Sequence, residues 1–151
     1  MSIMAKSMNE ENLKKVLQSN HVMIGSDGNA ISPEGALGDG NPHPRYYGTF
    51  PRVLGRYARE EKCFDFPGAV RKMTSMPAEK LGLQKRGLIK ENHFADLVVF
   101  NPDQIIDRAT FINPHQFPKG IEYVFVNGEM AVEKTRHTGV FSGRVLRSGS
   151  V

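Results

Sequence analysis

The residues best suited to chemistry follow a short apolar run at residues 21–24. Asp27 stands between Gly25 and Gly28, which let the backbone turn and let a substrate approach. Catalytic groups of α/β barrels sit at the C-terminal ends of strands. A carboxylate there can take a proton from a metal-bound water and return it to a leaving amine. An aspartate in a Ser-Asp-Gly turn can equally bond its own backbone, so local spacing leaves both interpretations open.

A second group of candidates lies in the Pro-His-Pro-Arg segment at residues 42–45. The prolines stiffen the backbone before Arg45, and a guanidinium can bind a substrate carboxylate through two parallel hydrogen bonds. His43 is a candidate hydrogen-bonding partner in the same pocket. The alternative is that both are solvated loop residues, and Tyr46 and Tyr47 either wall a pocket or pack on the following helix.

No spacing in the sequence is typical of a metal or nucleotide site. The five histidines show no His-x-His and no His-Glu-x-x-His pattern. Cys63 is the single cysteine, which excludes an internal disulfide and suits a reducing cytoplasm. Glycine-rich phosphate loops and the Gly-x-Ser-x-Gly nucleophile turn are also absent.

The elements that must position these residues are predicted to be helical in the first half of the chain. Ser7 and Glu10 have capping-box spacing. The apolar face of the helix they begin is Leu13, Val16 and Leu17. Residues 21–27 then predict a buried strand, and the Gly- and Pro-rich residues 29–44 predict a long functional loop.

Helices are expected again over about residues 49–81. Thr49 is the predicted cap of the first, whose inner face is Phe50, Val53, Leu54 and Tyr57. Further helices are predicted to begin at Pro67 and at Pro77, because proline suits the first helical position.

The second half of the chain is predicted to be β-rich. Residues 96–100, 121–126 and 129–133 have strand composition, and residues 143–147 predict a last short strand. Asn127-Gly128 separates two of these runs and predicts a tight hairpin, since both turn positions need positive φ.

Composition limits the classes of protein further. The chain has 151 residues, 39% of them hydrophobic and 24% charged, which indicates one folded domain. Apolar runs fall far short of the ~20 residues that span a bilayer, which excludes a membrane protein. The net charge of +4 comes without a dense basic block, so we expect no nucleic-acid partner, and non-specific phosphate contact is the remaining alternative. A complete (β/α)8 barrel needs roughly 200 residues or more, so we expect a soluble, cytoplasmic protein smaller than a barrel.

Several segments together resemble one enzyme family. They are residues 22–28, 43–55, 69–75, 87–89, 95–102 and 121–128. The chain resembles the N-acyl-D-amino-acid deacylase (D-aminoacylase) family of the amidohydrolase superfamily from about residue 8 to residue 147. The Ala-Asp-Leu-Val-Val-Phe and Val-Asn-Gly segments are typical of the whole superfamily, and the His-Pro-Arg stretch narrows the resemblance to the deacylases.

This resemblance implies an α/β fragment of a larger enzyme. The family is a zinc-dependent (β/α)8 barrel with a small β-domain, and it hydrolyses N-acyl-D-amino acids to a carboxylate and a D-amino acid. Residues 1–86 would be the end of the barrel, with its last strand at about 21–27 and helices at about 49–81. Residues 87–151 would be the C-terminal part of the small, β-sandwich-like domain.

The resemblance also implies roles for single residues. Asp27 corresponds to the general acid/base at the end of the eighth barrel strand, and is a candidate zinc ligand. Arg45 corresponds to a clamp for the substrate α-carboxylate, with His43 and Gly28 as further substrate-binding residues.

The family's remaining zinc ligands have no counterpart in this chain, which therefore resembles only the C-terminal portion. We expect the isolated chain to be inactive, not to retain zinc, and to need a complementary N-terminal polypeptide. Unpaired sheet edges predict a homo-oligomer. The alternative is a non-catalytic interaction module or remnant that self-associates through those edges.

Overall fold

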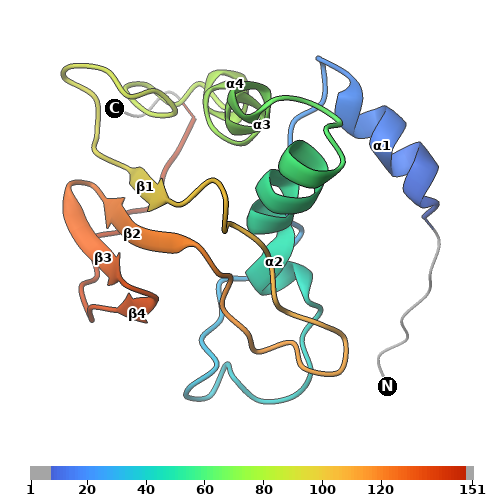
Figure 1. Ribbon diagram of the computed structural model, residues 1–151. Helices are drawn as coiled ribbons and strands as arrows, with labels where there is room; N and C mark the ends of the chain where they lie inside the picture. Colours follow the sequence, from blue (N-terminus) through green and yellow to red (C-terminus); the bar gives the residue numbers. More distant parts are fainter. Residues whose placement is uncertain (1–7, 149–151) are drawn as a thin grey trace.

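A computed structural model describes residues 8–148 as a group of helices followed by one antiparallel sheet (Figure 1). In chain order the elements are α1 (Glu10–Gln18), α2 (Arg45–Arg52), the π-helix η1 (Val53–Glu60), α3 (Phe66–Met73), α4 (Ser75–Lys80), β1 (Leu97–Phe100), β2 (Ile121–Val126), β3 (Glu129–Glu133) and β4 (Arg136–His137). The helices lie to one side of the sheet, and α1 is the helix farthest from it in this view. None of these helices is long and apolar enough to cross a membrane.

Helix α1 begins at an asparagine cap. The Asn9 side chain accepts hydrogen bonds from the backbone N–H groups of Glu11 and Asn12, which satisfies two of the free donors of the first turn. Ser7, the predicted cap, lies outside the described residues. Leu17 is buried as expected, but Val16 is 49% exposed and does not belong to the inner face.

Helix α2 begins earlier than predicted and continues directly into η1. Its N-cap is Pro44, whose φ of −53° already suits a helix. Thr49, the predicted cap, lies inside the helix, where its hydroxyl donates to the carbonyl of Arg45 at 3.0 Å. The prediction of a helix start at Thr49 was therefore wrong, and Arg45 stands at the first helical position.

The predicted strand at residues 21–27 is not formed. A strand needs a neighbouring strand for its backbone hydrogen bonds, and no described segment offers one to these residues. The segment is instead held by a bond from the N–H of Ile24 to the carbonyl of Lys72 in α3, at 3.1 Å. Residues 143–147 likewise form no strand, contrary to the sequence prediction.

The sheet has the order β1-β2-β3-β4, with every pair antiparallel. The predicted hairpin is confirmed, because Asn127 and Gly128 join β2 to β3 with φ values of 51° and 88°. A second turn with positive φ at Lys134 and Thr135 joins β3 to β4. The sheet is single and open, so the expected sandwich-like arrangement is corrected to one four-stranded layer.

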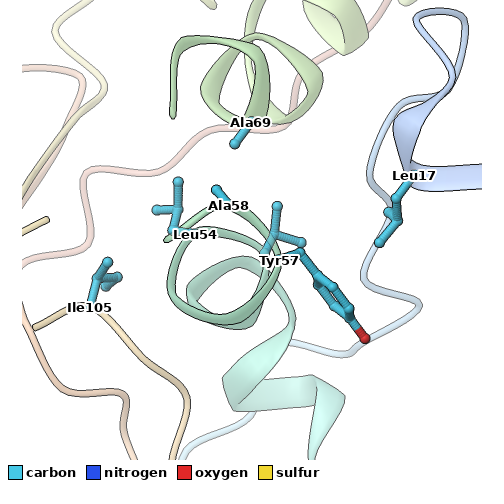
Figure 2. Packing of buried hydrophobic residues seen from close by; sticks show 7 residues of the cluster. Leu17, Leu54, Tyr57, Ala58, Ala69 and Ile105 are labelled. Carbon is cyan, nitrogen blue, oxygen red and sulfur yellow. The ribbon is translucent and has the colours of Figure 1, made fainter. Parts of the chain in front are cut away.

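The core joins the helices to the segment that connects β1 and β2. Its buried members are Leu17, Val53, Leu54, Tyr57, Ala58, Ala69 and Ile105 (Figure 2). Ile105 is only 1% exposed, and burying such a side chain contributes roughly 1.5–3 kcal/mol. The loop after β1 is therefore fixed against η1, and it carries residues that reach the start of α2.

Candidate functional site

The two strongest candidates from the sequence lie in direct contact. The Arg45 guanidinium donates through Nη2 to Oδ2 of Asp27 at 2.9 Å. Arg45 is held by its place at the start of α2, and Asp27 adopts a φ of +50°, a left-handed conformation that Asp tolerates better than most residues. The Asp27 side chain is 85% exposed and that of Arg45 38%, so the pair lies at the surface.

The Arg45 guanidinium also presents a second donor. Its Nε is buried and has no hydrogen-bond partner among residues 8–148. A carboxylate that binds an arginine in bidentate fashion uses two such donors. Asp27 therefore occupies Nη2 of Arg45, while the buried Nε has no partner among the described residues.

Gly28 lies against the first turn of α2. A Cβ at this position would lie 3.2 Å from Cα of Tyr46 and 3.4 Å from the carbonyl oxygen of Arg45. The neighbouring Asn29 side chain donates to the Tyr46 hydroxyl at 3.4 Å. A Cβ here would require the backbone of α2 to move by a few tenths of an ångström, so glycine favours the close approach of this segment to α2.

His43 supports the same turn through its ring. Its Nδ1 accepts the backbone N–H of Arg45 at 3.1 Å, and its ring packs edge-on against Phe111 with the centroids 5.0 Å apart. Burial lowers the pKa of His43, and the nearby Arg45 charge lowers it further, while Asp27 acts in the opposite direction. An accepting Nδ1 is the neutral form of the ring, which agrees with the lowered pKa.

Sequence reasoning missed the partners of α2 that come from beyond residue 100. Arg52 binds Oδ2 of Asp107 through Nε and Nη2, at 2.9 and 2.8 Å. The Tyr47 hydroxyl lies 2.9 Å from Nδ1 of His115, whose Nε2 lies 3.0 Å from the carbonyl of Gly40. No local pattern around Asp107 or His115 signals these contacts, because they join segments more than fifty residues apart.

The Asp27–Arg45 pair does not line an enclosed cavity. One hollow of about 300 Å³ lies beside His115 and Phe117. A larger one, of about 630 Å³, lies between the loop at Ile31 and the sheet at Val124. Neither includes Asp27 or Arg45, whose ion pair lies at the open surface of the described residues.

Comparison with known proteins decides the family. The profile of the amidohydrolase family matches residues 9–132. The chain belongs to the amidohydrolase family. Within the amidohydrolases it is 45% identical to a D-aminoacylase of Alcaligenes xylosoxydans xylosoxydans over 139 residues, and 41% identical to an N-acyl-D-glutamate deacylase of the same organism over 141 residues. The predicted resemblance to the D-aminoacylase family is confirmed.

Solved structures of these amidohydrolases share the fold of the chain. A crystal structure of D-aminoacylase superposes with a TM-score of 0.84 at 44% identity, covering 93% of this chain and 28% of that one. An N-acyl-D-glutamate deacylase from Bordetella bronchiseptica, complexed with zinc and a phosphonate inhibitor, gives a TM-score of 0.74 at 42% identity, covering 82% and 25%.

The chain spans about a quarter of the length of these amidohydrolases. The two Alcaligenes relatives align over 92% and 93% of this chain, but over only 27% of their own sequences. One related D-aminoacylase structure has a binuclear metal centre. Within residues 8–148, however, no three His, Cys, Asp or Glu side chains gather as a metal site would require. The described residues therefore do not fit a zinc ion by themselves.

Proposed function

We propose that this chain supplies the proton-transferring carboxylate and the substrate clamp of a metal-dependent N-acyl-D-amino-acid deacylase. The observation that carries the proposal is the contact between the Asp27 carboxylate and the Arg45 guanidinium at the surface of the described residues. The identity of 45% to a D-aminoacylase supports the substrate class. The chain would correspond to the C-terminal portion of such an enzyme, with the barrel ending near residue 86 and the β-domain beginning at residue 87.

Arg45 would recognise the α-carboxylate of the substrate. The incoming carboxylate would displace Asp27 from Nη2 and bind the exposed part of the guanidinium, where a bidentate pair can form. Substrate binding would in this way release the Asp27 carboxylate next to the bound molecule. His43 and Gly28 would keep the guanidinium and the carboxylate at this spacing, through the contacts described above.

Asp27 would then move one proton. Its carboxylate accepts a proton from the water that adds to the acyl carbon, and gives it to the amide nitrogen as the C–N bond breaks. The products are the free carboxylate and the D-amino acid. Zinc in the complete enzyme would be bound mainly by residues of a complementary polypeptide, since no three His, Cys, Asp or Glu side chains gather within residues 8–148 and Asp27 is the ligand that the resemblance suggests. The single cysteine, Cys63, supports a cytoplasmic location.

The test is complementation. We expect no release of D-amino acid from N-acetyl-D-amino acids by the purified chain with zinc, and no zinc retained after dialysis. Adding the N-terminal polypeptide of a related D-aminoacylase, with zinc, should restore turnover. Activity of the pure chain alone, or no activity with several such partners, would refute the proposal.

The variant Asp27→Asn tests the role of the carboxylate. In the complemented enzyme we expect kcat to fall about 10²- to 10⁴-fold, the usual contribution of a positioned acid/base. Asp103→Asn is the matched control, because Asp103 is an exposed loop aspartate. Equal rates for Asp27→Asn and Asp103→Asn would show that Asp27 is only a turn residue.

A second candidate function is a non-catalytic module that self-associates. It is supported by the open sheet, in which β1 is an edge strand and Val98 and Val99 are 54% and 46% exposed. This function predicts oligomers in solution and no rate enhancement with any complementary polypeptide.

A further inference from the structure

Lys72 is buried in α3 at only 3% exposure, which is rare for a lysine. Its Nζ donates to the backbone carbonyls of Ser19 and Val22, the latter at 3.1 Å. Its own carbonyl accepts the N–H of Ile24 at 3.1 Å. One residue thus makes three hydrogen bonds to residues 19–24, the segment that leads to Asp27.

The chemistry of these bonds explains how an ammonium group is tolerated there. Nζ has no carboxylate within salt-bridge distance in the described part of the chain. Burying a charge without partners is unfavourable, and burial lowers the pKa of Lys72, with a smaller contribution from Arg71. Ser19 is the C-cap of α1, and carbonyls at that end of a helix carry partial negative charge. The Ser19 carbonyl therefore compensates part of the cost of burial.

The position of this anchor matters because residues 21–27 pair with no strand within residues 8–148. Without a sheet, the segment is held at Ile24 by Lys72 and at Asp27 and Gly28 by α2. Asp27 lies three residues beyond Ile24, and three residues span about 10 Å at most. Loss of the hydrogen bonds that hold the segment near Ile24 would therefore change the position of the Asp27 carboxylate.

We propose that Lys72 is the positioning residue for Asp27, acting through its three hydrogen bonds to the backbone of residues 19–24. The inference rests on the proposed function for its catalytic consequence, but its structural part is testable on the chain alone. Lys72 does not touch the substrate in this proposal.

The first experiment is amide hydrogen exchange on the intact chain. In Lys72→Met we expect exchange at Ile24 and its neighbours to accelerate about tenfold or more, because two of the anchoring bonds are lost. The amides of β2 and β3 should keep their protection. Lys80→Met, at an exposed lysine of α4, is the control and should change neither region. Uniform acceleration over the whole chain, or no change at Ile24, would overturn the proposal.

A chemical rescue separates positioning from simple packing. Lys72→Cys in a Cys63→Ser background can be alkylated with 2-bromoethylamine while unfolded, which restores an ammonium group at nearly the same reach. After refolding, the alkylated protein should regain protection at Ile24, and the unalkylated protein should not. Equal protection in both forms would overturn the proposal, since the charge would then be irrelevant.

The catalytic readout is the split between kcat and KM in the complemented enzyme. Lys72→Met should lower kcat about tenfold or more and leave KM within about twofold, because Asp27 is displaced while Arg45 keeps its clamp. A rise in KM with kcat unchanged would contradict the role in positioning Asp27. If the wild-type complemented enzyme is inactive, the proposed function fails, and the exchange experiment still decides the role of Lys72.

Discussion

At the scale of single residues, the site depends on contacts around one arginine. Arg45 binds Asp27, and its backbone N–H donates to His43. Surface ion pairs contribute only about 0–1 kcal/mol, so the Asp27–Arg45 pair does little to stabilise the fold. In the proposed function, its geometry would keep the carboxylate and the guanidinium together, and a substrate carboxylate would replace Asp27 on the guanidinium.

The titration of His43 reports on this arrangement. Burial is the main cause of its lowered pKa and the Arg45 charge the second. We expect the NMR-monitored midpoint of its imidazole to lie below the ordinary value of 6.5, and to rise in Arg45→Met without returning fully. Arg136→Met, at an exposed arginine of β4, should leave the midpoint unchanged. A midpoint insensitive to Arg45→Met would show that the guanidinium does not act on the ring.

The lowered pKa of His43 also makes the free energy of unfolding depend on pH in one direction. As the pH falls below about 6.5, His43 of the unfolded chain binds a proton before His43 of the folded chain does. The folded state therefore loses stability as the pH falls from 6.5 to the lowered pKa, and loses no more below it. Urea unfolding over this pH range should show the loss, and His43→Gln should reduce it.

At the scale of elements, the continuous helix α2–η1 organises the molecule. It carries Arg45 at one end and the buried Val53, Leu54 and Tyr57 farther along. The wide π-helical turns bring Gly55 against the loop after β1, where a Cβ would lie 2.2 Å from the carbonyl oxygen of Ile105. This close contact fixes the β1–β2 connection, and with it Asp107 and His115, against the helix.

Gly55→Ala should therefore destabilise the protein strongly. The added methyl group has no space, and overpacking of this kind costs about 1–3 kcal/mol or more. Gly143→Ala is the control, because a methyl group added there would meet nothing within 4 Å, and the change in its stability should stay within about 0.5 kcal/mol. Urea unfolding followed by circular dichroism gives both values, and equal stabilities would contradict the tight contact.

At the scale of the whole molecule, two features are exposed: the Asp27–Arg45 ion pair and the edge strand β1, at which the sheet ends. The chain also spans only 27% of its curated relatives. These facts agree with a polypeptide that acts together with further protein surface, either a complementary portion of an amidohydrolase or another copy of itself.

Self-association through β1 can be tested by one substitution. An unpaired apolar edge favours strand pairing between copies, and a lysine on the edge opposes it. We expect Val99→Lys to shift the purified chain toward the monomer in sedimentation velocity runs at increasing concentration. Glu122→Lys, on the interior strand β2, is the control for added charge and should leave the distribution unchanged. Unchanged oligomers in Val99→Lys would place the interface elsewhere.

Local sequence determined the parts of this protein that need no distant partner. The hairpin at Asn127-Gly128 follows from two residues that accept positive φ. Residue type and spacing made Asp27 and Arg45 candidates, and the resemblance to the deacylases supplied their predicted roles. Tertiary structure decided the rest. Residues 21–27 have the composition of a strand but no neighbour to pair with, so they are held by Lys72 and by α2. The partners His115 and Asp107 were equally unpredictable, because a contact between distant segments depends on how the elements pack and leaves no local pattern.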